Sequence, residues 1–300
     1  MTLTKLLRGI WHRVGLIFGD EIYVRVEYFI VFGKRLRLKN PQTYSEKLQW
    51  LKLHEGDPIY TRMVDKAEAK KYVTEIIGEE YIIPTYGVWN HFDEIDFDKL
   101  PDQFVLKTTH DSGGVVICKD KKTLDKNAAK VKLEKSLKND YYYTSKEWPY
   151  KNVVPRIIAE KYMEDESGEF CDYKLFCFDG KMKALFIATD RFTSGEETKF
   201  DFFDENFNHL PFTNGHPNAT KPIKKPESFQ QMKDLAEKLS QKIPHVRVDF
   251  YCTKGNIYFG ELTFFHRGGF KRVEPEEWDY RFGEWINLPE KQSIIGRVRL

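Results

Sequence analysis

Cysteine is scarce in this chain of 300 residues, and its four cysteines show no CxxC spacing. They are Cys118, Cys171, Cys177 and Cys252, and each lies in an apolar, strand-like stretch. This pattern is typical of reduced thiols in the core of a cytosolic protein, and it gives no sign of a disulfide framework.

Long apolar runs and a surplus of one charge are also missing. No stretch approaches the roughly 18 apolar residues that span a bilayer, and Lys5, Arg8 and Arg13 would interrupt the core of a signal peptide. The 48 Lys and Arg nearly balance the 46 Asp and Glu, so no global field favours nucleic acid as a partner. We expect a cytoplasmic protein that does not bind nucleic acid.

The segment 6–38 allows two interpretations. It mixes basic residues with apolar and aromatic ones, among them Trp11, Phe18 and Phe29. Such a segment can lie on the inner face of a membrane, which would make the protein peripheral to the membrane or to a polysaccharide-assembly complex. It can equally form helices that cap the body of the protein.

Apolar and aromatic residues are plentiful, at 41% and 15% of the chain, which is enough for one large domain or two ordinary ones. Helical signals dominate residues 1–100, where Thr43-Tyr44-Ser45-Glu46 fits a capping box. From about Phe104 the pattern becomes rich in strands. We expect an α+β fold, with a helical region at 1–100, a small lobe at 101–158 and a large lobe at 159–300.

A β-hairpin with one carboxylate on each strand is predicted over residues 246–264. If residues 254–256 form a three-residue loop, Asp249 and Glu261 face each other, whereas a two-residue loop would place them on opposite faces. Carboxylates opposed at roughly 5 Å repel unless a cation lies between them, and a divalent metal ion is the simplest candidate. Alternatively, both acids face solvent on an edge hairpin.

A second motif over residues 104–117 is a strand, a polar loop with two glycines and another strand. Gly113 and Gly114 allow a close backbone approach in which N–H groups point at an anion, and Lys107 adds a positive charge. It is not a Walker A loop, since GxxxxGK[ST] is absent. The alternative is an ordinary Gly-Gly turn with a surface lysine.

The order of these elements resembles the ATP-grasp superfamily, in which two lobes clamp ATP between their sheets. Five segments are similar to the subgroup named after the teichuronopeptide biosynthesis protein TupA. They are NPQTYSEKLQWLK (40–52), VDK (64–66), HDSGG (110–114), DYKLFCFDG (172–180) and FGELT (259–263). The resemblance covers residues 20–290, and the combination is specific although each piece is weak.

The resemblance implies which residues hold ATP. The set is Lys66, Lys107, Gly113, Gly114, Glu160, Lys161, Met163 and Lys174. Lys66 and Lys107 would contact phosphates under the glycine loop, and Lys174 would reach the γ-phosphate. Glu160, Lys161 and Met163 would hold the adenine, the last two through backbone atoms.

The resemblance also implies a Mg²⁺ site at the hairpin, formed by Asp249 and Glu261. Arg247 shares a strand face with Asp249 through the alternation of side chains, so it could contact the transferring phosphoryl group. Two features depart from the general pattern. The usual Glu-x-Asn is Glu261-Leu262-Thr263 here, so that Thr263 would replace an amide ligand. The region before Lys66 is also too short and too helical for the usual N-terminal α/β domain.

A basic, glycine-rich segment, residues 265–272, follows the hairpin. Arg267 in this segment could grip the carboxylate to be activated in a bidentate way, and Arg191 is a second candidate. Either arginine can instead pair with a neighbouring acid on the surface. His266 could be a base, or it could form only local hydrogen bonds.

We expect an ADP-forming ATP-grasp ligase. A carboxylate would attack the γ-phosphate of Mg·ATP, and an amine would displace phosphate to form an amide, with Lys107, Arg247 and Arg267 at the reacting groups. The resemblance implies bacterial surface-polysaccharide biosynthesis, such as capsule or teichuronopeptide, with an amino acid or peptide joined to a uronate-type carboxylate. Alternatives are a non-catalytic ATP-binding scaffold and a glycosyltransferase of the same pathway, for which Asp201-Phe202-Phe203-Asp204 comes nearest to a DxD motif.

Overall fold

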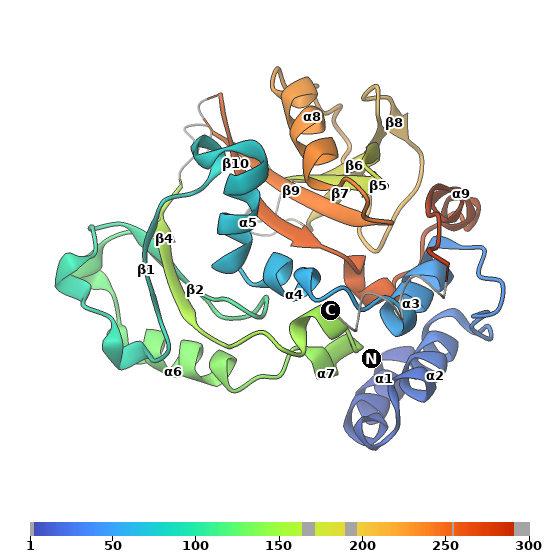
Figure 1. The fold of residues 1–300 in the computed structure, drawn as a ribbon, viewed down its shortest axis with the longest axis horizontal. Helices are drawn as coiled ribbons and strands as arrows, with labels where there is room; N and C mark the ends of the chain where they lie inside the picture. The colour runs from blue at the N-terminus through green and yellow to red at the C-terminus, as the bar shows by residue number, and fades with distance from the viewer. Residues whose placement is uncertain (1–2, 164–171, 190–196, 254, 291–300) are drawn as a thin grey trace.

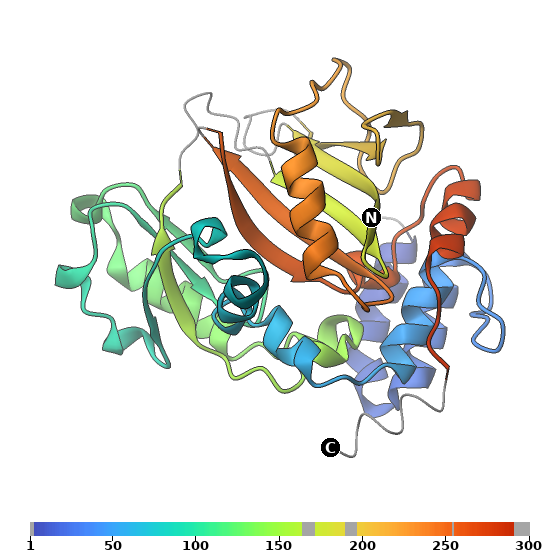
Figure 2. The same cartoon turned by 45° about the horizontal axis from the view of Figure 1, so that its top comes forward.

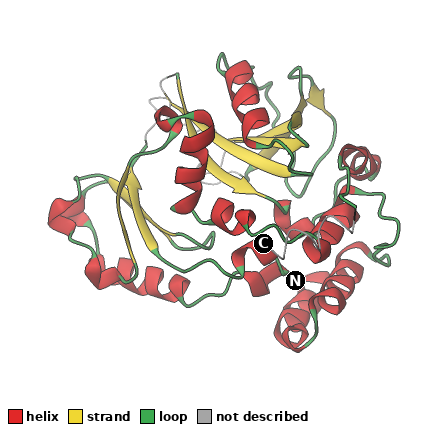
Figure 3. Cartoon of the chain, in the orientation of Figure 1, coloured by secondary structure: helices red, strands yellow, loops and turns green. Residues whose placement is uncertain are grey.

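The computed structural model describes residues 3–163, 172–189, 197–253 and 255–290, which form two antiparallel sheets surrounded by helices (Figures 1 and 3). The α-helices are α1 (Leu3–Val14), α2 (Asp20–Phe32), α3 (Tyr44–His54), α4 (Ile59–Val64), α5 (Glu68–Ile77), α6 (Lys126–Leu137), α7 (Tyr142–Ser145), α8 (Phe229–Leu239) and α9 (Glu277–Trp285). The strands are β1 (Thr85–Trp89), β2 (Phe104–Thr108), β3 (Val115–Cys118), β4 (Ile157–Lys161), β5 (Asp172–Phe178), β6 (Lys181–Thr189), β7 (Lys199–Asp204), β8 (His209–Leu210), β9 (Val246–Thr253) and β10 (Asn256–Thr263). The predicted α+β class is confirmed.

The smaller lobe is built on a four-stranded sheet with the order β1-β4-β2-β3. Helix α6 packs against β2 and β3. Its Leu133 joins Phe104, Leu106 and Ile157 in a hydrophobic core that is separate from the rest of the molecule. Because the small lobe has a hydrophobic core of its own, it forms a distinct structural unit that can supply one side of a site between the two lobes.

The larger lobe contains a six-stranded sheet with the order β10-β9-β5-β6-β7-β8. Helix α8 packs against β5, β6 and β9 and crosses one face of this sheet in Figure 2. The N-terminal helices complete the same core, since Tyr23 of α2 and Leu48 of α3 cluster with Phe176 and Val248 of the sheet. Helices α2 and α3 are therefore part of the large lobe rather than of a separate module.

Local signals located several elements, but the predicted boundaries at 100 and 158 do not follow the two sheets. The capping box at the start of α3 is confirmed, with Thr43 accepting from the backbone of Glu46. Strand β1, from the region expected to be helical, pairs with β4, and the boundary at 158 falls inside β4. Strand β1 has only five residues, and none of them is buried.

Two further expectations concern the chain as a whole. Cys118, Cys177 and Cys252 are free thiols, as predicted, while Cys171 lies outside the described residues. Within the described ranges, none of the helices has both the length and the apolar character needed to cross a membrane.

Candidate active site

The hairpin of β9 and β10 pairs Asp249 with Glu261, as the sequence predicts. The expected three-residue loop is wrong, because Thr253 pairs with Asn256 and only two residues separate them. A bulge at Gly260 shifts the register by one residue and restores the pairing of the two acids. Glycine suits this position, because a Cβ would lie 3.1 Å from the carbonyl oxygen of Asp249.

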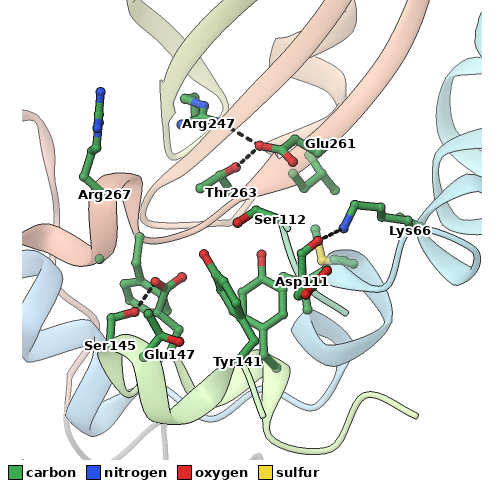
Figure 4. Close-up of a pocket in the computed structure, with 18 of the residues that line it drawn as sticks. Lys66, Asp111, Ser112, Tyr141, Ser145, Glu147, Arg247, Glu261, Thr263 and Arg267 are labelled. Atoms are coloured by element: carbon green, nitrogen blue, oxygen red, sulfur yellow. Dashed lines mark hydrogen bonds and ion pairs between the residues drawn. The ribbon is translucent and has the colours of Figure 1, made fainter. Parts of the chain in front are cut away.

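A guanidinium group lies between these two carboxylates. Nε and Nη2 of Arg247 donate to Oδ1 and Oδ2 of Asp249 at 2.6 and 2.7 Å. Nη2 also donates to Oε1 of Glu261 at 2.7 Å (Figure 4). Nη1 lies 2.8 Å from Nδ1 of His266. Burial and the charge of Arg247 lower the pKa of His266 well below its usual range, so the neutral ring accepts this bond. His266 therefore positions Arg247 through local hydrogen bonding.

A second cation reaches the pair from the neighbouring strand. Lys174 on β5 lies opposite Asp249 in the sheet and donates to its carboxylate. Burial raises the pKa of Asp249 to about 6, although Arg247 and Lys174 oppose the shift. Burial also acts to raise the pKa of Glu261, but Arg247, Lys174 and Lys66 outweigh it and lower the value to about 2. Glu261 therefore stays ionised near neutral pH.

Two lysines share one buried carboxylate in the small lobe. Glu160 on β4 lies 2.7 Å from Nζ of Lys107 on β2 and 2.6 Å from Nζ of Lys70 on α5. Burial acts to raise the pKa of Glu160, but the two lysines lower it to about 2. Sequence reasoning missed Lys70, because nothing in its helical segment distinguishes it from the neighbouring Lys71. The structure makes Glu160 the counter-ion that fixes both lysines.

The expected backbone contacts with adenine lie at the end of β4. The N–H of Lys161 donates to the carbonyl of Pro84 at 2.9 Å, while its side chain is exposed. Met163 is half-buried. Since the Lys161 N–H is already bonded, a contact between this residue and an adenine edge would have to use its carbonyl.

The glycine loop between β2 and β3 is held by hydrogen bonds of its own. Asp111 accepts from the side chains of Thr108 and Ser136 and from the N–H of Gly114 at 3.2 Å. A Cβ on Gly114 would lie 2.1 Å from Oγ1 of Thr108, whereas a Cβ on Gly113 would meet nothing closer than 3.7 Å. The N–H of Gly114 thus serves the loop itself, contrary to the expectation that it points at an anion.

A cavity of about 270 Å³ lies where the two lobes meet, and Figure 4 shows its walls. Five expected residues line it, namely Lys66, Arg247, Glu261, Thr263 and Arg267. Among the described residues, the lining leaves out Lys107, Gly113, Gly114, Glu160, Lys161, Met163, Lys174 and Asp249. The expected residues therefore divide into a group that lines the cavity and a group that does not.

Lys66 reaches the cavity from the segment just before α5. Its N–H donates to the carbonyl of Thr109 at 3.0 Å, and its ammonium group donates to the carbonyl of Asp111. These bonds tie the start of α5 to the glycine loop. Burial lowers the pKa of Lys66, while the charge of Glu261 acts in the opposite direction.

Arg267 stands in a short loop of left-handed backbone. Arg267 and Gly268 have φ angles of 54° and 64°. The guanidinium lies over the ring of Phe200, 5.3 Å from the ring centroid, and Arg267 lies on the same side of the cavity as the hairpin (Figure 4). Arg191, the other expected carboxylate ligand, and Lys254 of the expected loop lie outside the described residues.

The wall opposite the hairpin was not predicted. It contains the hydroxyl groups of Ser112, Tyr141 and Ser145 and the carboxylate of Glu147 (Figure 4). Glu147 is buried and accepts a hydrogen bond from Oγ of Ser145 at 2.5 Å. Burial raises the pKa of Glu147, and it raises that of Tyr141 to about 12. No spacing in residues 139–151 signals a site, so only the fold identifies these side chains.

Several solved ligases resemble this chain at low sequence identity. L-amino acid ligase from Bacillus licheniformis is 14% identical, with a TM-score of 0.47, over 85% of this chain and 57% of that one. D-alanine–D-alanine ligase from Bacillus anthracis, complexed with ATP, is 17% identical, with a TM-score of 0.40, over 68% of this chain and 54% of that one. The chain thus spans little more than half the length of these two enzymes.

The family comparison covers more of the chain. No protein of curated function gives a significant match. Residues 46–287 match the family described as TupA-like ATP-grasp. This match extends over both sheets, the glycine loop and the hairpin, which together are the two-lobed α+β architecture of the ATP-grasp fold. The chain therefore belongs to the TupA-like ATP-grasp family.

Proposed function

We propose that this protein is an ADP-forming ligase that joins a carboxylate to an amine through an acylphosphate. The observation that supports this best is one cavity that gathers Lys66, Arg247 and Arg267 around the exposed carboxylate of Glu261. Cations of this kind bind phosphate and carboxylate groups, and an ionised carboxylate binds the metal that accompanies ATP. Family membership supports ATP as the cofactor.

The proposed roles come from the family resemblance, and two of the residues, Lys66 and Arg247, line the cavity. Lys66 and Lys107 would hold ATP phosphates, with Lys107 oriented by Glu160, and Lys174 would support the γ-phosphate region beside Asp249. Arg247 would meet the transferring phosphoryl group. Rate enhancement in such a site comes mainly from positioning and from electrostatic stabilisation of the charge on the transferring group.

Two of the three expected Mg²⁺ ligands in the hairpin have oxygen atoms that face the cavity, and the third does not. The side chain of Glu261 is 46% exposed, and Oγ1 of Thr263 lies 3.0 Å from its Oε1, so both residues offer oxygen atoms in the cavity. The oxygens of the fully buried Asp249 accept from Arg247 and Lys174, so it becomes a ligand only where Arg247 releases it. We therefore assign Mg²⁺ to Glu261 and Thr263, with Asp249 as a further ligand. When bound, the metal would neutralise phosphate charge.

The side chains around the hairpin suit a metal ion that binds together with the nucleotide. In the part of the chain that the structure describes, no three His, Cys, Asp or Glu side chains gather into a metal site. Mg²⁺ commonly binds through one or two carboxylates together with substrate phosphates, rather than in a cage made by the protein alone. The proposed site is of that open type.

The substrates are proposed from the family name and from the charges in the cavity. Arg267 would bind the carboxylate to be activated, since a guanidinium grips a carboxylate with two parallel bonds. The family match is to TupA-like proteins. The sequence resemblance to the subgroup named after the teichuronopeptide biosynthesis protein TupA supports a uronate-type carboxylate, an amino acid or peptide as the amine, and a role in bacterial surface polysaccharides.

The acids of the glycosyltransferase alternative have structural partners. Asp201 accepts from the N–H of Ala219 at 2.9 Å and pairs with His209 at 3.1 Å. Asp204 accepts from the backbone of Asn208 at 2.8 Å in the turn after β7. Neither carboxylate lines the cavity described above, so this geometry does not favour a nucleotide-sugar site.

The deciding experiment follows the products of ATP. We would incubate the protein with Mg·ATP and a panel of uronic acids and amino acids and measure ADP, AMP and phosphate. ADP should form only with a matching pair, and oxygen label in the acceptor carboxylate should appear in the released phosphate. Formation of AMP and pyrophosphate, or transfer of a sugar without ATP, would exclude the acylphosphate route. Nucleotide binding without any turnover would favour the scaffold alternative.

We further infer that α1 and α2 form a membrane-facing surface. Helix α1 turns its polar side inward, where Arg8 and His12 contact Glu27 of α2 at 2.5 and 3.2 Å. Its apolar side, which includes Leu6 and Ile10, faces outward. Residues 6–29 contain eight of the sixteen large apolar side chains that are exposed in the described structure, which is a strong concentration.

The charge of this region complements an anionic lipid surface. Residues 1–39 carry eight Lys and Arg against three Asp and Glu, so the remainder of the nearly neutral chain is slightly acidic. A helix pair with apolar side chains between basic ones is typical of proteins that lie in the membrane interface. Contact through α1 would also bring the cavity close to the membrane, because Arg8 and His12 line it.

Vesicle flotation tests this surface. The protein should float with vesicles that contain phosphatidylglycerol and much less with pure phosphatidylcholine, and Ile10→Asp should abolish flotation. Val131→Asp is the matched control, because Val131 is 70% exposed on α6, away from this surface. If the Ile10→Asp variant floats like the unmodified protein, the membrane assignment is wrong. It is also wrong if the only effect of Ile10→Asp is to convert a dimer of this protein into monomers.

A further inference from the structure

We propose that Glu147, with Ser145 and Tyr141, forms the binding site for the amine substrate, and that Glu147 takes the proton the amine loses. This inference rests on the proposed ligase function and adds the class of nucleophile, a primary amine that arrives as an ammonium ion. It begins from the cavity wall opposite the hairpin, where these three side chains lie together (Figure 4).

Glu147 is a buried acid that forms no direct ion pair among the described residues, although the charges of Lys52 and Arg247 act on it. Its residue exposure is 4%, and the one hydrogen bond to its carboxylate among the described residues comes from Ser145. No Lys or Arg in the described ranges lies within ion-pair distance of it. A buried carboxylate in this state is costly, and a ligand that brings a positive charge relieves the cost.

Lys52, whose charge acts to lower the pKa of Glu147, donates its hydrogen bonds to other groups. Nζ of Lys52 donates to Oε1 of Gln49 at 2.9 Å and to the carbonyl of Gly268 at 2.6 Å, and it lies 4.4 Å from the ring centroid of Phe270. Burial lowers the pKa of Lys52 to about 7. The ammonium group of Lys52 is bonded to neutral acceptors. Lys52 therefore does not explain why the Glu147 carboxylate borders the cavity.

The two walls divide the substrates by charge. Lys66, Arg247 and Arg267 on one side suit phosphate and carboxylate groups, whereas an ammonium ion is repelled there and attracted to Glu147. The two sites are adjacent, because a Cβ built on Gly268, the residue after Arg267, would lie 3.5 Å from Oε1 of Glu147. The groups to be joined would thus be held side by side.

The chemistry balances with these residues alone. The ammonium ion gives one proton to the Glu147 carboxylate, and the freed lone pair of the nitrogen attacks the acyl carbon. The bond from that carbon to the phosphate oxygen breaks, phosphate leaves with the electron pair, and the second proton lost from nitrogen passes to phosphate or water. The pKa of Glu147, which burial raises, suits a group that accepts a proton from nitrogen.

Kinetics with two nucleophiles would test the base. Glu147→Gln keeps the shape of the side chain and removes its charge. We expect KM for the amino acid to rise by about tenfold to a hundredfold and kcat to fall, because a charge-assisted contact is lost. Hydroxylamine is uncharged near neutral pH, so hydroxamate formation from the acylphosphate should change little. Equal losses with both nucleophiles would overturn the proposal, since a merely structural role would affect both.

A binding measurement that needs no turnover separates this proposal from the ligase function. Ethanolamine should raise the melting temperature of the protein in a concentration-dependent way, and ethylene glycol, in which a hydroxyl replaces the amine, should not. Glu147→Gln should abolish the ethanolamine effect. Glu55→Gln, a change in another buried acid that does not line the cavity, should preserve it. No shift with ethanolamine, or the same shift in Glu147→Gln, would exclude the site even if ADP is formed.

Discussion

The two lobes neutralise their buried charges in different ways. In the small lobe, the single carboxylate of Glu160 is shared by Lys107 of β2 and by Lys70, which reaches it from α5, a helix of the large-lobe core. In the large lobe, one guanidinium, that of Arg247, joins the carboxylates of Asp249 and Glu261. One cluster is two cations around an acid, and the other is two acids around a cation.

The difference shows which ligand each lobe prepares for. Loss of contact with Glu160 would leave lysines that attract anions, which suits the phosphates of a nucleotide. Withdrawal of Arg247 would leave two opposed carboxylates, which attract a divalent cation. In the absence of ligand, the negative charge of Glu160 occupies the place that a phosphate would take beside the lysines. The positive charge of Arg247 occupies the place that a metal ion would take between the two carboxylates. The predictions below test this comparison.

The largest effect is expected from Arg247→Met. The change removes the cation between two carboxylates, one of them fully buried, and such a loss costs about 3–5 kcal/mol of unfolding free energy. Urea denaturation would measure it, and adding Asp249→Asn should recover part of the loss in a double-mutant cycle. A cost below about 1 kcal/mol would mean that Arg247 does not balance the pair.

The small lobe should respond to acid. The pKa of Glu160 is about 2 in the folded protein against 4.5 as its ordinary value, so its contribution is present above pH 4.5 and is lost as the pH falls through 2. The shift corresponds to about 3 kcal/mol, and Glu160→Gln should flatten the decline in stability below pH 4.5. Glu75→Gln, in an exposed pair with Arg62, is the control and should leave the decline unchanged. An equal decline in the Glu160→Gln variant would show that its pairing with the lysines is weak.

A smaller change is expected from Lys107→Ala. If the shared lysines serve phosphate, the variant should bind ATP more weakly by about 1.5–3 kcal/mol, measured by calorimetry with Mg·ATP. The exposed Lys122 is a suitable control, whereas Lys121 is not, because it donates to the carbonyls of Phe97 and Leu100. Unchanged affinity would confine Lys107 to a structural role.

The same contrast shows what could be predicted from the sequence. Period-2 alternation placed Arg247 beside Asp249, and the capping box located α3, because both signals act over a few residues. The meeting of Lys70 with Glu160 joins positions ninety residues apart, and no local pattern encodes it. Glu147 has the same difficulty, since its importance comes from the cavity it borders and not from its neighbours in the chain.

The bulge at Gly260 in β10 means that the extra residue of this hairpin lies within the strand rather than in the turn. Next to the turn, Thr253 pairs with Asn256. Beyond Gly260 the pairing register shifts by one residue, so that Asp249 pairs with Glu261. A turn one residue longer and no bulge would give the same pairing at the site. Related chains can therefore exchange an insertion at the tip for a deletion near Gly260 while the acids keep their places. We expect a one-residue change at the tip of this hairpin to be accompanied in related chains by a change near Gly260.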